Sequence, residues 1–381
     1  MPPTRSSFIS WLACVLALVA PLYPTTAGAQ TLDSTRVELL KEALPLSPDR
    51  VMEMAATEGS WMSVDVSPDG GTVVFDLLGD LWTVPLSGGQ ATPLTRGMGF
   101  DAMPRFSPDG ERVVYVSDRD GGENLWILSL DLTDTTQLTT GKGDSSLSPE
   151  WTPDGDYVVA TKGSKLWMWH REGGGGVQLI EEPGNLRTVG AAFGDDDRWV
   201  WFSGRFSQGS LYNNGLDLYQ LHVYDRDTGE ISPRSNRWGS GMRPTLSPDG
   251  RWLVYGSRHI ADTGLRIRDL DTGEERWLAY PVQRDDQESG SSRDLYPGMA
   301  FTPDSREVVA FYGGGLWRIP VDGGAPSEIP FRADVELPLG PVVDFDYPIS
   351  DSPTFVAKQI RDAVPSPDGE RLAFTLSLIH I

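Results

Sequence analysis

The chain of 381 residues carries a formal charge of −22, because 54 acidic residues stand against 32 Lys and Arg. This excess of acid argues against nucleic acid or an anionic membrane as a partner, since both need a basic face. The 42 glycines and 29 prolines favour a fold of short strands and turns.

The N-terminus has the pattern of a secretory signal peptide spanning residues 1–29. Arg5 precedes an apolar run over residues 8–20, and the small residues 27–29 offer a cleavage site after Ala29. The run is too short to span a bilayer comfortably, so we expect no membrane span after cleavage and a periplasmic or secreted protein. A retained anchor and a lipid-modified Cys14 are the alternatives. Cys14 is the single cysteine, and its removal would exclude disulfides and thiolate sites.

Residues 30–56 form a polar lead that ends in a β-rich run at residues 51–55.

Residues 57–97 contain four short β-rich runs separated by turns. The first two are joined by Ser67-Pro68-Asp69-Gly70, which has the residue preferences of a type I turn. Equivalent turns recur at residues 107–110, 152–155, 247–250, 302–305 and 366–369, with a degenerate copy at 194–197.

An aromatic residue recurs in the third run of most of these units. It follows Leu at positions 82, 126, 167, 219 and 317. A period of about 40 residues with four strands per repeat is typical of β-propeller blades. The sequence therefore predicts an all-β fold, with a six-bladed propeller of four-stranded antiparallel blades over residues 57–332. A propeller commonly closes its ring when a strand from the start of the chain completes the last blade, and we expect residues 51–55 to be this ring-closing strand.

Insertions fall between the second and third strands of a unit and between units, so they lie on one face, opposite the Ser-Pro-Asp-Gly turns. Loops on a rigid scaffold often carry binding residues. Two polar clusters on this face are the candidate binding-face residues: Arg258, His259 and Asp262, and Asp285, Asp286, Glu288 and Arg293. A solvated acidic loop, a domain contact, a polar-ligand site and a divalent-cation site remain open for them.

Catalytic motifs are missing from the sequence. It has no Gly-x-Ser-x-Gly or His-Glu-x-x-His motif, and the glycines at residues 173–176 lack the Lys of a phosphate loop. The turn aspartates occur once per unit, too far apart for a metal cluster. We therefore assign no catalytic, cofactor-binding or metal-binding residue in this chain.

Two further segments follow the sixth unit. Residues 333–352 are Pro-rich and acidic, and we interpret them as a linker. Residues 353–381 contain a strand-like run and another Ser-Pro-Asp-Gly turn, which predicts the truncated start of a second propeller.

The repeated turn, Leu-Trp, Gly-Gly and Leu-Thr pattern resembles the TolB-like, WD40-like propeller repeats. Residues 61–70, 117–126, 264–270, 277–288 and 361–375 are also similar to the N-terminal propeller region of secreted bacterial amidohydrolase-family proteins. This resemblance implies a metal-dependent hydrolase barrel downstream, holding a divalent metal, with none of its ligands in this chain.

Three functional hypotheses follow. In the favoured one, the chain is the non-catalytic propeller of an amidohydrolase-type enzyme and gates or docks substrate or a partner domain. Its partners would be its own downstream domains, another protein, a peptide or a small polar substrate. The alternatives are a stand-alone periplasmic interaction propeller and the propeller of a tricorn-like or prolyl-oligopeptidase-like peptidase.

Overall fold

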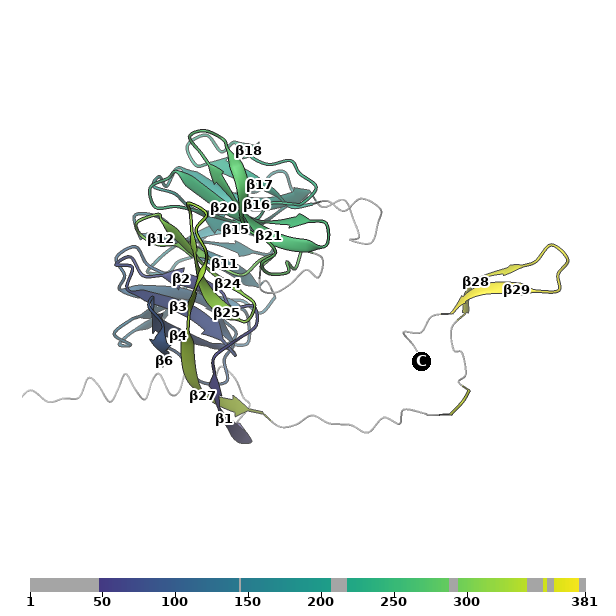
Figure 1. Ribbon diagram of the computed structural model, residues 1–381, viewed down its shortest axis with the longest axis horizontal. Helices are drawn as coiled ribbons and strands as arrows, with labels where there is room; N and C mark the ends of the chain where they lie inside the picture. The colour runs from purple at the N-terminus through teal and green to yellow at the C-terminus, as the bar shows by residue number, and fades with distance from the viewer. Residues whose placement is uncertain are drawn as a thin grey trace, which may run out of the picture. The chain divides into compact units, whose positions relative to one another are not determined.

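The computed structural model describes residues 48–143, 145–206, 218–287, 294–340, 352–354 and 360–376. It divides into two compact units, Met1–Gly340 and Pro341–Ile381. The regular structure of the described residues is β-strand throughout (Figure 1). Within these ranges, no helix has the length and apolar character needed to cross a membrane. The predicted signal peptide and its cleavage site lie outside the described residues.

The described residues of the first unit form six four-stranded antiparallel sheets, numbered here in chain order. The first three sheets consist of β2 (Val64–Val66), β3 (Thr72–Leu77), β4 (Asp80–Pro85) and β6 (Thr92–Pro93); β7 (Asp101–Phe106), β8 (Arg112–Ser117), β9 (Asn124–Ser129) and β10 (Thr135–Gln137); and β11 (Ser146–Trp151), β12 (Tyr157–Lys162), β13 (Lys165–His170) and β14 (Val177–Gln178). The last three consist of β15 (Leu186–Ala192), β16 (Trp199–Phe206), β17 (Gln220–Asp225) and β18 (Ile231–Pro233); β19 (Met242–Leu246), β20 (Trp252–His259), β21 (Asp262–Asp269) and β22 (Glu275–Ala279); and β23 (Ala300–Phe301), β24 (Glu307–Tyr312), β25 (Gly315–Pro320) and β26 (Ser327–Ile329).

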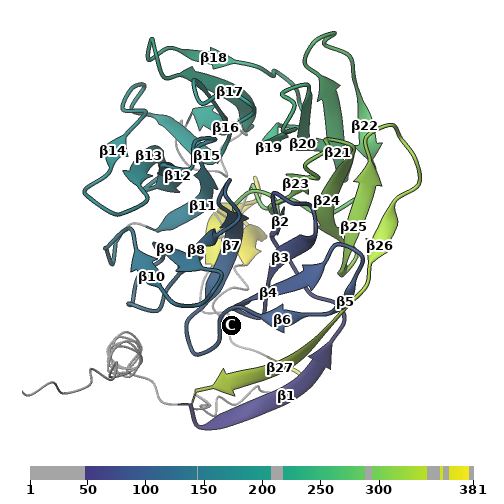
Figure 2. The same ribbon diagram turned by 90° about the vertical axis from the view of Figure 1, so that its left-hand side faces the viewer.

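The six sheets are arranged around an axis, with the first strand of each sheet innermost (Figure 2). The first and sixth sheets meet directly, because the Val64 amide donates to the Gly298 carbonyl over 3.0 Å and the Gly59 amide donates to the Gly314 carbonyl over 2.9 Å. The prediction of an all-β propeller built from four-stranded antiparallel sheets is confirmed.

The Ser-Pro-Asp-Gly turns have the geometry predicted for them. In the first turn the Gly70 amide donates to the Ser67 carbonyl over 2.8 Å, and Gly70 has a φ of +73°, which favours glycine. The Ser67 hydroxyl donates to Asp69 over 2.5 Å and accepts from the Thr72 amide over 2.9 Å. Each turn therefore closes its hairpin with its own side chains.

The prediction of a ring-closing strand at residues 51–55 is wrong. β1 (Arg50–Ala56) pairs antiparallel with β27 (Phe331–Leu339), and β27 pairs parallel with β5 (Gly89–Gln90). The sixth sheet is complete without β1, because β26 supplies its fourth strand. β1 and β27 instead lie outside the first sheet (Figure 2).

The prediction of a linker at residues 333–352 is also wrong over its first part, which belongs to β27. Phe331, Ala333 and Val335 are buried and alternate with exposed residues, because successive side chains of a strand point to opposite faces. Residues 341–351 lie outside the described residues. In the second unit, β28 (Ile360–Pro365) and β29 (Leu372–Leu376) form the predicted hairpin around residues 366–369. A second propeller stays a prediction.

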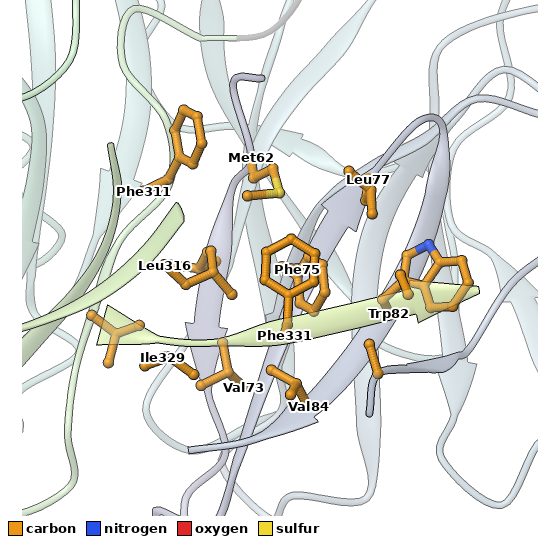
Figure 3. Packing of buried hydrophobic residues seen from close by; sticks show 14 of the residues in the cluster. Met62, Val73, Phe75, Leu77, Trp82, Val84, Phe311, Leu316, Ile329 and Phe331 are labelled. Carbon is orange, nitrogen blue, oxygen red and sulfur yellow. The ribbon is translucent and has the colours of Figure 1, made fainter. Parts of the chain in front are cut away.

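A large apolar cluster forms where the first sheet meets β27 and the sixth sheet (Figure 3). Phe331 of β27 packs on Phe75 of β3 with ring centroids 5.0 Å apart. Trp82, one of the recurrent third-strand aromatics, is buried in the same cluster. The predicted role of these aromatics in packing is confirmed at Trp82.

Candidate functional site

Four of the six innermost strands carry a β-bulge near their end. The register shifts between Ala102 and Arg105 in β7, and at the same place in β11, β15 and β19. The bulges place residues in the left-handed region, with φ values of 57° at Met103, 52° at Ser148, 71° at Gly190 and 52° at Arg243. Bulges re-aim side chains, and these act on the strands nearest the axis.

The inner strands enclose an axial cavity of about 370 Å³ that opens on the face of the Ser-Pro-Asp-Gly turns. The prolines Pro68, Pro108, Pro248 and Pro303 of four such turns line its mouth. All six sheets contribute lining residues, including Asp65, Arg105, Glu150, Ala192, Thr245 and Ala300.

Arg105 is buried at this cavity between two carboxylates. Its Nη1 lies 3.4 Å from Asp65 and its Nε lies 3.2 Å from Glu150. Nη1 also donates to the Val64 carbonyl over 2.8 Å. Gly298 makes room for this guanidinium, because a Cβ there would lie only 3.0 Å from Nη2 of Arg105.

The two carboxylates are not fully compensated by the one arginine. Burial raises the pKa of Asp65 above its usual range, and Arg105 opposes this only in part. Burial also raises the pKa of Glu150, with Arg105 opposing the rise and Asp65 adding to it. Asp65 and Glu150 keep 15% and 25% of their side-chain surface exposed toward the cavity. If both carboxylates are ionised, the layer carries one more negative charge than positive, and Arg243 of the deeper layer also favours their charged forms.

A second charged layer lies two residues deeper along the inner strands. Asp294, from the loop that follows β22, accepts from Nη1 of Arg243 over 2.5 Å and from the Ser148 hydroxyl. Burial lowers the pKa of Arg243, and Asp294 opposes this by favouring the charged form. Asp294 thus joins the third and fifth sheets at the axis, and its negative charge is paired with the positive charge of Arg243.

The axial cavity can bind a cation through Asp65 and Glu150. A hydrogen bond donated by an ammonium group stabilises the ionised form of a carboxylate. Such a charge-assisted bond is stronger than a hydrogen bond between two neutral groups. Among the described residues, no group of three or more His, Cys, Asp or Glu side chains is placed to hold a metal ion.

The structure brings together part of the site predicted on the opposite face. Arg258 binds Asp285 with both nitrogens, Nε and Nη2, at 2.6 Å each, and Thr263 donates to Asp285 over 2.5 Å. Burial opposes ionisation of Asp285, but these bonds hold its pKa below the usual value. A cavity of about 340 Å³ lies beside this pair and is also lined by Asp262.

The other described residues of the predicted set make separate contacts, although His259 lies opposite Asp262 in the ladder of β20 and β21. His259 packs against Trp277 and Tyr280, with ring centroids 6.1 Å and 5.8 Å away. Asp286 lies 4.0 Å from Arg284. Glu288 and Arg293 lie outside the described residues. The binding role of this set stays a prediction, and its best-formed pair is an ion pair already satisfied within the chain.

Sequence reasoning missed the axial residues. A signal for them was present, because Asp65, Arg105 and Glu150 each stand two positions before the Ser or Thr of a turn. Aligned repeats show charges at this position in the first three units and Ala or Thr in the rest. Charges in a strand expected at the centre of a propeller indicate an axial site.

Comparison with known proteins agrees with this geometry. Residues 44–186 match the model of the TolB beta propeller domain. The chain carries a TolB-like β-propeller.

Solved structures and curated relatives extend the match beyond these residues. The crystal structure of TolB from Acinetobacter baumannii superposes on this chain with a TM-score of 0.53 and 19% sequence identity. The match covers 71% of this chain and 64% of that TolB chain, and it shows a shared fold. "Uncharacterized peptidase YuxL" of Bacillus subtilis is 27% identical over 48% of this chain and 26% of its own length. "Tricorn protease homolog 1" of Streptomyces coelicolor is 32% identical over 66% of this chain and 28% of its own length. The matched part of this chain thus spans about a quarter of the length of these two relatives.

Proposed function

We propose that this TolB-like propeller is a non-catalytic docking domain that binds a cationic polypeptide segment at its axial cavity. The observation that carries this proposal is the buried Asp65–Arg105–Glu150 layer, in which two carboxylates share one guanidinium. A lysine side chain or an N-terminal amine entering from the turn face would supply the missing positive charge.

We further propose that the propeller serves a larger secreted or periplasmic hydrolase by gating or docking its substrate. The signal-like N-terminus supports export, and the low coverage of the peptidase relatives supports additional domains in such proteins. The amidohydrolase type of the parent rests on the resemblance of the repeat sequences. The peptidase relatives favour the second candidate, a propeller that filters peptides for a protease domain.

Calorimetric titration of the full chain tests the docking function. The probe is a five-residue peptide with two lysines and a blocked C-terminus, and its matched control replaces both lysines with norleucine. We expect Glu150→Gln to weaken binding of the lysine peptide by about tenfold, the loss of one charge-assisted hydrogen bond. Glu111→Gln, at an exposed position of a neighbouring turn, serves as the control variant and should bind normally.

Equal binding of the lysine and norleucine peptides would contradict a cation site. The non-catalytic role is tested separately, because a domain that only docks a partner should hydrolyse no substrate. Hydrolysis of a peptide or an amide by the purified chain, abolished by a chelator, would overturn that role without bearing on cation binding.

A further inference from the structure

Two arginines lie directly opposite each other in the fourth sheet. Arg187 of β15 and Arg205 of β16 are partners in the antiparallel ladder, so their side chains point to the same face of the sheet. Arg187 is the second residue of β15 and Arg205 is the last but one of β16, so both lie at the end of this hairpin away from its turn. The two residues, which we call the arginine pair, therefore lie on the insertion face. They also lie near the axis, because β15 is the innermost strand of its sheet (Figure 2).

The arginine pair has no counter-charge within the described part of the chain. Neither side chain forms an ion pair there, whereas Arg198, at the other end of the same hairpin, is paired with Asp225 at 2.7 Å. Like charges directly opposite each other in a ladder destabilise it, and a buried charge without a partner is costly. The arrangement is therefore unfavourable for folding by itself, which indicates a role in binding.

Arg205 is held in place without being neutralised. It is only 8% exposed, and its Cζ lies 4.8 Å from the ring centroid of Tyr219. This cation–π contact orients the guanidinium group but supplies no full negative charge. The Nε atom of Arg205 is buried and has no hydrogen-bond acceptor among the described residues. A fixed, buried guanidinium group with an unused donor is suited to an anionic ligand.

Both arginines act on the same phenol group, that of Tyr219. Burial raises the pKa of Tyr219, the positive charges of Arg205 and Arg187 oppose this rise, and Asp294 adds to it. The negative charge of Asp294 is already paired with Arg243, so it does not serve as the counter-charge of the arginine pair. Arg187 is exposed, so an anion can reach the pair from solvent.

We propose that the arginine pair binds an oxyanion, the carboxylate or phosphate group of a ligand that reaches the insertion face. Planar guanidinium groups bind both of these groups through two parallel hydrogen bonds. An anion between the two side chains would offset their repulsion across the ladder and would give the buried guanidinium group a charged partner. This site goes beyond the proposed cation site and differs from the axial cavity in both face and sign of charge.

Calorimetric titration of the full chain in about 50 mM salt, low enough to limit screening, tests the proposal. One probe is acetyl-dialanine with a free C-terminal carboxylate, and its matched control is the same peptide with a C-terminal amide. Inorganic phosphate is the second probe. Arg187→Gln is the main variant, because Arg187 is exposed and its loss should not prevent folding. Arg284→Gln, at an arginine that is 80% exposed on another loop, is the control.

We expect the carboxylate peptide, phosphate or both to bind, and Arg187→Gln to weaken binding by about tenfold while Arg284→Gln leaves it unchanged. Binding of one probe alone would support the proposal and identify the ligand group as a carboxylate or a phosphate. The proposal would be overturned if neither anion bound, if the amide peptide bound as tightly as the acid without phosphate binding, or if the two variants had equal effects.

The stability of the variant without a ligand gives a second test. Arg187→Gln should melt no lower than the parent protein, because the substitution removes a like charge from the ladder. A lower melting temperature would show that Arg187 stabilises the fold through contacts within the chain, and it would overturn the proposal.

Discussion

Asp80 is a residue at which pH should act directly on stability. It is 3% exposed, and its Oδ1 is buried with no hydrogen-bond partner among the described residues. Asn124 and Gln220 begin the third strands of other sheets and accept bonds from hydroxyls over 2.9 and 2.8 Å. At Asp80 the corresponding residue is Thr95, whose hydroxyl accepts from the Leu81 amide over 2.9 Å. Burial and the nearby Asp101 raise the pKa of Asp80 to about 7.

A raised pKa means that the folded protein holds this proton more tightly than the unfolded chain. Asp80 therefore lowers the free energy of unfolding as pH rises from 3.8, its ordinary pKa, through about 7. We expect Asp80→Asn to raise the free energy of unfolding at pH 8 by roughly 1–2 kcal/mol, because a neutral amide avoids the cost of burying the charged carboxylate. Below pH 4 the gain should disappear.

Urea unfolding at the two pH values measures this difference. Asp156→Asn, at an exposed aspartate, serves as the control and should show no such dependence on pH. A gain from Asp80→Asn of the same size at both pH values would show that folding does not raise the pKa of Asp80.

The recurrent third-strand aromatics differ in burial, and so should the effects of their removal. Trp82 is buried in the cluster between the first sheet and β27, whereas Trp167 is half-buried at the edge of its cluster. We expect Trp82→Ala to cost roughly 3–5 kcal/mol in free energy of unfolding and Trp167→Ala to cost less. Chemical denaturation of both variants measures the two losses in free energy of unfolding. A fully stable Trp82→Ala protein would contradict the burial of Trp82 in this cluster.

At the scale of elements, the sequence predicted most of the sheets because turn and strand signals recur together. The Ser-Pro-Asp-Gly turns set each first hairpin, and the Leu-aromatic pairs mark the third strands. β27 was missed although Phe331, Ala333 and Val335 alternate with charged residues, because prolines and acidic residues nearby favoured a linker. The pairing of β1 could not be predicted without β27, since a strand alone does not show its partner.

The pairing of β1 with β27 can be tested by an engineered disulfide. Met52 and Leu337 lie directly opposite each other in the ladder, so their Cα atoms are close enough for a bridge. In a Cys14→Ser background, we expect Met52→Cys with Leu337→Cys to oxidise to an intramolecular disulfide, seen by peptide mass analysis.

The matched control combines Met52→Cys with Glu336→Cys, whose side chain points to the opposite face of the ladder. It should oxidise more slowly. Equal oxidation of both pairs, or of neither, would contradict the register.

At the scale of the whole molecule, the propeller presents two faces with different character. The insertion face was predicted to bind, but its clearest pair, Arg258 and Asp285, is satisfied within the chain. The turn face opens onto Asp65 and Glu150, which share the single guanidinium of Arg105. This site could not be derived from loop lengths, because its residues lie on inner strands of three different sheets.

A crystal structure of the full chain with the two-lysine peptide bound would test the central claim most directly. The account predicts density for the peptide in the axial cavity, with an ammonium nitrogen within about 3 Å of a carboxylate oxygen of Asp65 or Glu150. Density for the same peptide on the insertion face, beside Asp262 and Asp285, with an empty axial cavity would contradict it.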